Sequence, residues 1–126
     1  MTDSPAMLPK VRSKMIMDAP KNLPEMGCQL RLASFLGLPC SGRDTLVMAH
    51  NDFSPGSGMS TKNSALEAIC GCHLCHALLG RHDARGVMIR DNHPHEFYRQ
   101  IIRASASTRA WLVSEGIITV KDGELV

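Results

Sequence analysis

The stretch ICGCHLCHALLG, residues 69–80, crowds cysteines and histidines together more densely than any other part of this sequence. Cys72 and Cys75 form a C-x-x-C knuckle, the spacing with which two thiolates of one tight turn bind the same Zn²⁺ ion. Gly71 is expected to divide the stretch into a helical turn and a helix that begins at His73. Gly80 stands where such a helix should end.

Two further cysteines, Cys28 and Cys40, lie well upstream of the knuckle. With Cys72 and Cys75 they would complete a tetrahedral Cys₄ site, which is typical of structural zinc. The alternative is a set of ordinary buried cysteines, because free cysteine is among the most buried residue types. The total of five cysteines is odd and favours reduced thiolates on a metal, hence a cytoplasmic protein, over a disulfide framework. Cys70 is expected to be a buried thiol outside the site.

Length and composition indicate one domain with a modest core. The chain has 126 residues, 44% of them hydrophobic but only 4% aromatic, and a formal net charge of +2. Such a weak basic balance is compatible with nucleic acid as a partner without requiring one. No apolar run reaches the roughly 18 to 20 residues of a membrane span, and the N-terminus lacks the apolar core of a secretory signal. We therefore expect no membrane partner.

The pattern of the remaining chain predicts an α+β fold with an irregular N-terminal arm, residues 1–27, and a zinc-bound domain, residues 28–126. A short helix is expected around residues 11–17, a strand from Cys28 onward, and a buried strand over residues 45–50 that ends at His50. Residues 51–63 and 81–93 are predicted to be loops. The clearest helix begins at Pro94 and carries one apolar stripe, consisting of Phe97, Ile101, Ala104, Thr108, Trp111 and Leu112. Gly116 should end it, before a short strand over residues 117–120.

The order of these motifs resembles the HNH nucleases, also called His-Me finger or ββα-metal nucleases. The matching points are Cys28 and Cys40, LVMAH ending at His50, the glycine-rich GSGMSTK, and the run CHLCH ending at His76. The similarity is greatest to the small zinc-bound YbcO-like proteins of phages and prophages, which are related to the NinG/Rap recombination nucleases. It extends from about Cys28 to Val120, and it implies a zinc-bound ββα fold with a C-terminal amphipathic helix.

The resemblance implies a metal-dependent endonuclease that hydrolyses DNA phosphodiester bonds, in phage recombination or DNA processing. By position, His50 becomes the general base that deprotonates water, a role that suits an imidazole near neutral pH. His76 becomes a ligand of a catalytic Mg²⁺ or Mn²⁺ ion, while the zinc has no open coordination position and serves as a scaffold. Lys62 and Arg81 are weak candidates for contacts to DNA phosphates. A recombination protein is a further possible partner.

Two departures from the family pattern favour a second interpretation: Gly80 and Ala65 stand where relatives commonly carry acidic residues. A third departure, Ala49 in place of the first member of a His-His or Asp-His pair, is shared within the YbcO-like subgroup. The chain could therefore be a non-catalytic zinc module of the same fold that binds nucleic acid or a recombination protein. On its own residues, His50 would be a core histidine at a strand end. The residues that could replace the missing acids are Asp52, Glu67, His82 and Asp83.

The other basic side chains have an ordinary explanation. Arg85 and Arg90 are predicted in a loop near the candidate site, where scattered basic residues usually serve solubility. Arg99 and Arg103 lie one helical turn apart and are expected on the solvated face of the last helix.

Overall fold

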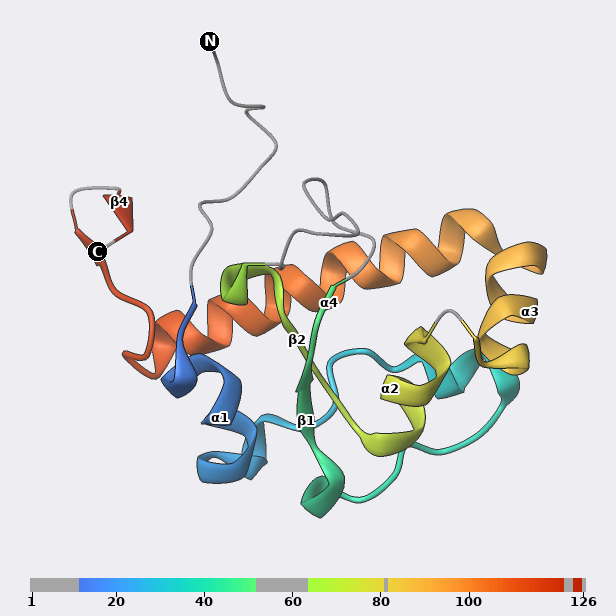
Figure 1. Cartoon of the computed structure of the whole chain (residues 1–126), viewed down its shortest axis with the longest axis horizontal. Helices are drawn as coiled ribbons and strands as arrows, with labels where there is room; N and C mark the ends of the chain where they lie inside the picture. Colours follow the sequence, from blue (N-terminus) through green and yellow to red (C-terminus); the bar gives the residue numbers. More distant parts are fainter. Residues whose placement is uncertain (1–11, 52–63, 81, 122–123, 126) are drawn as a thin grey trace, which may run out of the picture.

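A short antiparallel pair of strands, β1 (Val47–Ala49) and β2 (Ile69–Gly71), lies among helices in the computed structural model. The structure describes residues 12–51, 64–80, 82–121 and 124–125. Its helices are α1 (Lys14–Asn22), α2 (His73–Leu79), α3 (Ala84–Asn92) and α4 (Pro94–Ser114). Short 3₁₀ turns occupy Pro24–Met26, Leu32–Leu36, Arg43–Thr45 and Ala65–Glu67, and a second strand pair, β3 (Val120–Lys121) with β4 (Glu124–Leu125), lies near the C-terminus. The architecture is a small α+β domain (Figure 1).

The core forms where α1 packs against β1 and α4 packs against β2. α4 is the long helix that runs along one side of the molecule in Figure 1. The predicted apolar stripe of α4 is confirmed, because Phe97, Ile101, Ala104, Thr108 and Leu112 are buried and Trp111 is partly buried against the core. Each large apolar side chain buried in this way stabilises the fold by about 1.5–3 kcal/mol.

β2 is a strand where the sequence predicted a helical turn. The preceding residues do form one 3₁₀ turn, which Ser64 caps by accepting a hydrogen bond from Leu66 N. The chain then extends through Ile69 and Cys70, which are both fully buried and pair with β1. The helix that follows starts at His73 and stops at Gly80, as predicted.

Three other expectations are wrong. The strand predicted over residues 117–120 begins only at Val120, as β3, because Ile117 N and Ile118 N donate to Leu112 O at the end of α4. Residues 84–92 form α3 although a loop was predicted. The Asp83 carboxylate caps this helix by accepting from the backbone N–H groups of Arg85 and Gly86. The predicted strand from Cys28 onward is also absent from the described residues. Arg31 there has a φ of 52°, in the left-handed region, and the chain turns into a 3₁₀ helix. A strand cannot continue through that conformation.

Although it is not a regular strand, the segment after Cys28 lies along β2. The backbone N–H groups of Gln29 and Leu30 both donate to Cys70 O, at 2.8 and 3.3 Å. A Cβ at Gly71 would overlap with the Leu30 side chain, so only glycine allows the two segments to pack this closely. The C-terminal end of β2 is thereby fixed against the segment that carries Cys28.

The N-terminal region contributes more residues to the core than the short helix predicted around residues 11–17 would. α1 spans nine residues, Lys14–Asn22, and is capped by Ser13, whose hydroxyl accepts from Ile16 N. Ile16 and Ala19 of α1 are buried in the core, together with Met26 of the next turn. No helix among the described residues is long and apolar enough to cross a membrane.

Candidate metal centre

Cys72 and Cys75 are held by the first turn of α2. Cys72 is the N-cap residue of that helix, and its Sγ accepts a hydrogen bond from Cys75 N at 3.4 Å. His76 N then donates to Cys72 O at 2.8 Å, which closes the turn. Both cysteine side chains are fully buried. The knuckle predicted from the spacing is therefore also a helix start, in which sulfur takes the capping role usually filled by oxygen.

Cys28 and Cys40 approach the knuckle from two separate connections. Cys28 directly precedes the segment that is hydrogen-bonded to β2, and Cys40 follows the 3₁₀ turn Leu32–Leu36. The residue after Cys40 fixes its position: Ser41 N donates to Cys72 Sγ at 3.3 Å, and Ser41 Oγ accepts from Leu74 N at 3.3 Å. A connection far from α2 in the sequence is thereby attached to the N-terminus of that helix.

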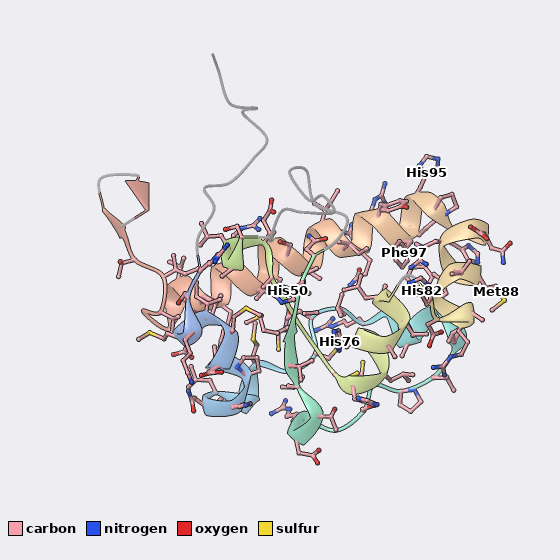
Figure 2. All side chains as sticks on the ribbon, in the orientation of Figure 1. His50, His76, His82, Met88, His95 and Phe97 are labelled. Atoms are coloured by element: carbon pink, nitrogen blue, oxygen red, sulfur yellow. The ribbon has the colours of Figure 1, made fainter. Side chains whose placement is uncertain are left out.

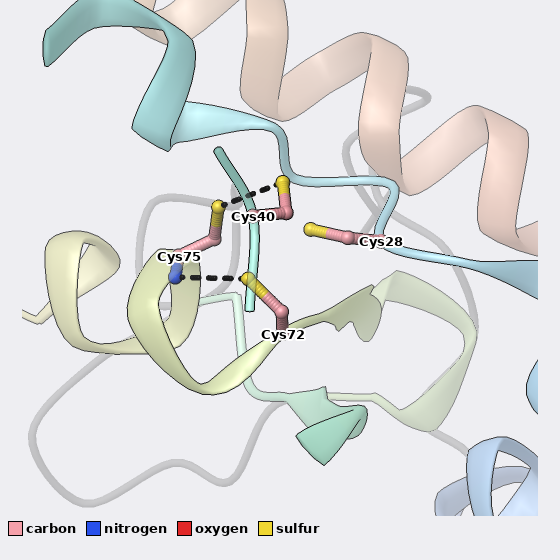
Figure 3. A group of neighbouring side chains, drawn as sticks. All are labelled: Cys28, Cys40, Cys72 and Cys75. Atoms are coloured by element: carbon pink, nitrogen blue, oxygen red, sulfur yellow. Dashed lines mark hydrogen bonds between the residues drawn. The ribbon is translucent and has the colours of Figure 1, made fainter. Parts of the chain in front are cut away.

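The four Sγ atoms of Cys28, Cys40, Cys72 and Cys75 all lie within 4.8 Å of one another (Figure 3). Cys40 Sγ and Cys75 Sγ are 3.7 Å apart, and all four cysteines are free thiols. In a tetrahedral site with Zn–S bonds of about 2.3 Å, neighbouring sulfur atoms are separated by roughly 3.8 Å. The observed cluster is therefore already close to the dimensions of a zinc site, and the predicted grouping of these four cysteines is confirmed.

Backbone N–H groups point at three of the four sulfur atoms. Arg31 N donates to Cys28 Sγ at 3.5 Å, and Ala33 N donates to Cys75 Sγ at 3.4 Å. Cys72 Sγ accepts from both Ser41 N and Cys75 N. Donors arranged around thiolates orient the ligands of a metal and offset their negative charge. This outer layer is difficult to explain as the packing of neutral thiols, since thiols are weak hydrogen-bond acceptors.

Without a bound cation, the thiols of Cys28, Cys40 and Cys75 differ widely in pKa. The hydrogen bond from Cys75 lowers the pKa of Cys28 to about 5, and the same interaction raises the pKa of Cys75. Burial and the neighbouring Cys28 charge raise the pKa of Cys40 to about 11. One thiolate is thus favoured and further ones are opposed, because like charges at this distance repel. Four thiolates together require a cation among them.

Cys70 lies outside the cluster, as predicted. Its side chain is fully buried, and its Sγ donates to Gly27 O at 3.5 Å. Burial, followed by the charges of Cys28 and Cys72, raises the pKa of the Cys70 thiol to about 12. Such a thiol stays protonated at neutral pH, so Cys70 is a packing residue.

The two histidines with predicted catalytic roles are both exposed, one just after β1 and the other on α2. His50 directly follows β1, and His76 lies on α2, which contacts β1 (Figure 2). Among the described residues, the four cysteines are the only group of three or more Cys, His, Asp or Glu side chains close enough together to hold an ion. No group of three such ligands that includes His76 is therefore preformed in that part of the chain.

The remaining predicted site residues separate into three groups. Lys62, Arg81 and Asp52 lie outside the described residues. Asp83 is occupied as the cap of α3, where hydrogen bonding to Arg85 and Gly86 lowers the pKa of its carboxyl group. Glu67 is buried, with its charge near Arg109, and His82 is exposed.

The sequence reasoning missed the residues that orient the cysteines. Ser41 has a recognisable signal, because a serine directly after a ligand cysteine can present both its N–H and its hydroxyl group to the neighbouring turn. The N–H groups of Arg31 and Ala33 carry no side-chain signal and emerge only with the three-dimensional structure.

Comparison with family models, curated proteins and solved structures finds no match to this chain. The metal centre is therefore defined by its own geometry: four sulfur atoms, three of which receive backbone hydrogen bonds, with two cysteines fixed by a helix start. A set of four thiolates is the chemistry of structural zinc.

Proposed function

We propose that this chain is a zinc-stabilised ββα domain that hydrolyses DNA phosphodiester bonds with a second, harder divalent ion. The observation that supports this is the arrangement around the knuckle: two antiparallel strands precede a helix, His50 directly follows the first strand, and His76 lies on the helix. This is the order of elements expected from the resemblance to HNH nucleases. Both side chains are exposed, as groups that meet a large substrate must be.

In this proposal the zinc site has a structural role, and the two histidines have the catalytic roles. Cys28, Cys40, Cys72 and Cys75 hold zinc and thereby fix the start of α2, and with it the position of His76. His50 accepts a proton from the attacking water, and His76 offers an imidazole nitrogen to Mg²⁺ or Mn²⁺. Such an ion, when bound, would neutralise the charge that develops on the phosphate.

The second candidate function is a non-catalytic zinc module that binds nucleic acid or a recombination protein. Two observations favour it. Gly80, at the end of α2, offers no carboxylate at the position where the related nucleases commonly have one. The described residues also contain no second cluster of metal ligands beside His76. Both functions share the zinc site and differ in whether a phosphodiester bond is broken.

A cleavage assay with His50→Ala distinguishes the two. The zinc-loaded protein is incubated with linear and branched DNA in the presence of Mg²⁺ or Mn²⁺, and product formation is measured for wild type, His50→Ala and His95→Ala. His95 is an exposed histidine on α4 and serves as a matched control. Cleavage should fall by roughly 10²- to 10⁴-fold in His50→Ala alone. A wild-type protein that binds DNA and cuts none of these substrates with either ion supports the binding module.

A further inference from the structure

Two adjoining hollows lie beside the metal centre and share Arg31 and Ser34. The first, of about 400 Å³, extends past Cys28 and Cys40 to Arg43. The second, of about 330 Å³, extends along α4 past Gln100 to Arg103. They adjoin at these two shared residues, and we call the pair together the arginine trough.

The arginine trough carries positive charge that only the cysteine cluster offsets. Arg31, Arg43 and Arg103 line it, and none of the other lining residues is Asp or Glu. Cys28 and Cys40 also line it, and their cluster keeps a net negative charge when zinc is bound, because four thiolates outweigh one Zn²⁺ ion. Within the described part of the chain, the ion pairs are Lys14–Asp18 and Arg85–Asp83, so no described carboxylate neutralises these three guanidinium groups. Asp44 follows Arg43 in the sequence but does not line the trough. Arg31 Nε donates to Cys28 O at 3.4 Å, so an anion would enter without displacing an internal carboxylate and would bind the remaining guanidinium N–H groups.

The polar side chains between the arginines are held in place. Gln100 Nε2 donates to Gln29 O and Leu30 O, at 3.3 and 3.0 Å, and Ser107 Oγ donates to Gln29 Oε1 at 2.5 Å. These contacts join α4 to the segment after Cys28, and Gln29, Gln100 and Ser107 line the second hollow. This lining is polar, which suits a ligand that is itself polar along its length.

Arg31 is positioned by the metal centre. Its backbone has a φ of 52°, an uncommon conformation for a residue other than glycine. Arg31 N donates to Cys28 Sγ, and Arg31 O accepts from both Ser34 N and Ser34 Oγ. Strained backbone of this kind persists where the surrounding structure holds it, and it is found preferentially at functional sites. The cysteine cluster therefore sets the direction in which the Arg31 side chain leaves the chain.

The second hollow of the trough is separate from the proposed catalytic histidines, whereas the first reaches Arg43 and Leu46, just before β1. Cys70 N donates to Thr108 Oγ1, and Cys70 O accepts from Gln29 N, although Cys70 is paired with Met48 of β1. In an antiparallel ladder the N–H and C=O of one residue point toward the same side, so both groups of Cys70 point away from β1. Gln29 and α4 thus lie along the opposite edge of β2 from β1, which His50 follows.

We propose that the arginine trough binds the sugar-phosphate backbone of a nucleic acid. Guanidinium groups form paired hydrogen bonds with phosphate oxygens, and arginines from separate elements can contact successive phosphates of one strand. The serine and glutamine side chains add the neutral polar contacts common at sugar-phosphate backbones. This inference goes beyond the proposed cleavage, because it holds whether or not the chain cuts what it binds.

The test uses charge-matched variants of the full chain. Arg31→Gln/Arg103→Gln removes two charges from the trough. Arg12→Gln/Arg99→Gln removes two charges from exposed positions that do not line it. Equal zinc content and equal thermal unfolding establish that both variants are folded. Binding of single- and double-stranded DNA of about 20 nucleotides is then followed by fluorescence anisotropy across a range of salt concentrations. A His50→Ala background excludes cleavage.

The trough variant should bind at least about 10-fold more weakly than wild type, and the slope of log K against log salt should shrink by roughly 1.5 to 2. The control variant should stay close to wild type. Equal losses in both variants, or none in the trough variant, would overturn the proposal. Competition by inorganic phosphate or by polyglutamate as strong as that by DNA, at equal charge, would also overturn it in favour of a simple anion site or an acidic protein. Loss of cleavage in His50→Ala with binding intact concerns the catalytic proposal alone.

Discussion

The Thr108 hydroxyl joins the long helix to the central strand, because Thr108 Oγ1 accepts a hydrogen bond from Cys70 N at 3.2 Å. The same hydroxyl donates to Ala104 O at 2.8 Å. Thr108 and Cys70 are both fully buried, so neither group has water as an alternative partner. A single side chain of α4 thus satisfies the backbone of the strand that leads into the knuckle.

Replacing Thr108 with valine should remove the hydrogen bond from Cys70 N while preserving the shape of the side chain. The Cys70 N–H would then be buried without an acceptor, which costs about 1–3 kcal/mol of unfolding free energy. Thr108→Ser, which keeps the hydroxyl, is the matched control. Amide hydrogen exchange provides the specific readout: protection at Cys70 should fall in the valine variant and persist in the serine variant. Unchanged protection in Thr108→Val would show that another group accepts this bond.

Zinc should be necessary for the fold, and the ligand and non-ligand cysteines should respond differently. Cys75→Ser removes a buried ligand from the four-sulfur cluster, so we expect zinc loss and loss of cooperative thermal unfolding. Cys70→Ser removes an equally buried sulfur that lies outside the cluster. That variant should retain one zinc per chain and lose only about 1–2 kcal/mol of stability. Elemental analysis that finds no zinc in wild type, or full zinc in Cys75→Ser, would contradict the metal site.

His76 should be dispensable for zinc and required for cleavage. Its side chain is exposed and lies outside the cysteine cluster, so His76→Ala should change the unfolding free energy by no more than about 0.5–1 kcal/mol. Cleavage should fall, with partial recovery at high Mg²⁺ or Mn²⁺ concentration if affinity for the ion is the only loss. Zinc release from His76→Ala would mean that the knuckle is a single metal site that includes this histidine.

An acid introduced at the end of α2 should strengthen the binding of the second ion. Gly80 has an ordinary negative φ of −62°, and a Cβ there would lie 3.1 Å from Ala77 O, so a side chain fits after a shift of a few tenths of an ångström. Gly80→Asp should therefore fold, and it should lower the Mg²⁺ concentration needed for half-maximal cleavage. Gly80→Asn controls for shape without charge. An equal response in both variants would exclude a ligand role for the new carboxylate.

Gly86 should tolerate no side chain, because a Cβ at that position would overlap with the backbone carbonyl of Leu78. Gly86→Ala should force α3 away from α2 and destabilise the fold by about 1–3 kcal/mol, despite the better helix propensity of alanine. Gly80→Ala, where the nearest atom is a tight but adjustable contact, should be much milder. Thermal unfolding of the two variants measures the difference, and a Gly86→Ala protein as stable as wild type would refute this packing.

The sequence predicted the parts of the fold that have strong local signals. The spacing of Cys72 and Cys75 indicated the knuckle, and the stripe from Phe97 to Leu112 indicated α4. β2 was missed because three residues are too few for a periodic signal, and the turn before it has helical propensity. α3 was missed because only Gly86 and Ile89 of its residues are buried, which leaves no apolar stripe to recognise.

The candidate site, like the fold, could be predicted only where the sequence carries a strong local signal. The four cysteines were predictable because soft ligands at fixed spacing are rare outside metal sites. The arginine trough was not, since Arg31 lies far from Arg103 in the sequence and nothing local distinguishes Arg103 from Arg99, its neighbour one turn away. Only the packing of α4 against the segment after Cys28 brings the two arginines to one surface.

The division of the zinc ligands between two parts of the chain has a consequence for the ribosome-bound polypeptide. Cys28 and Cys40 precede β1, whereas Cys72 and Cys75 follow β2. A chain synthesised only as far as β1 therefore presents two thiolates, an incomplete coordination shell, and an unpaired strand edge. Metal capture, strand pairing and the covering of β2 by α4 all wait for the second half to emerge. The domain should therefore fold late in translation, and zinc binding and folding should occur together in one step.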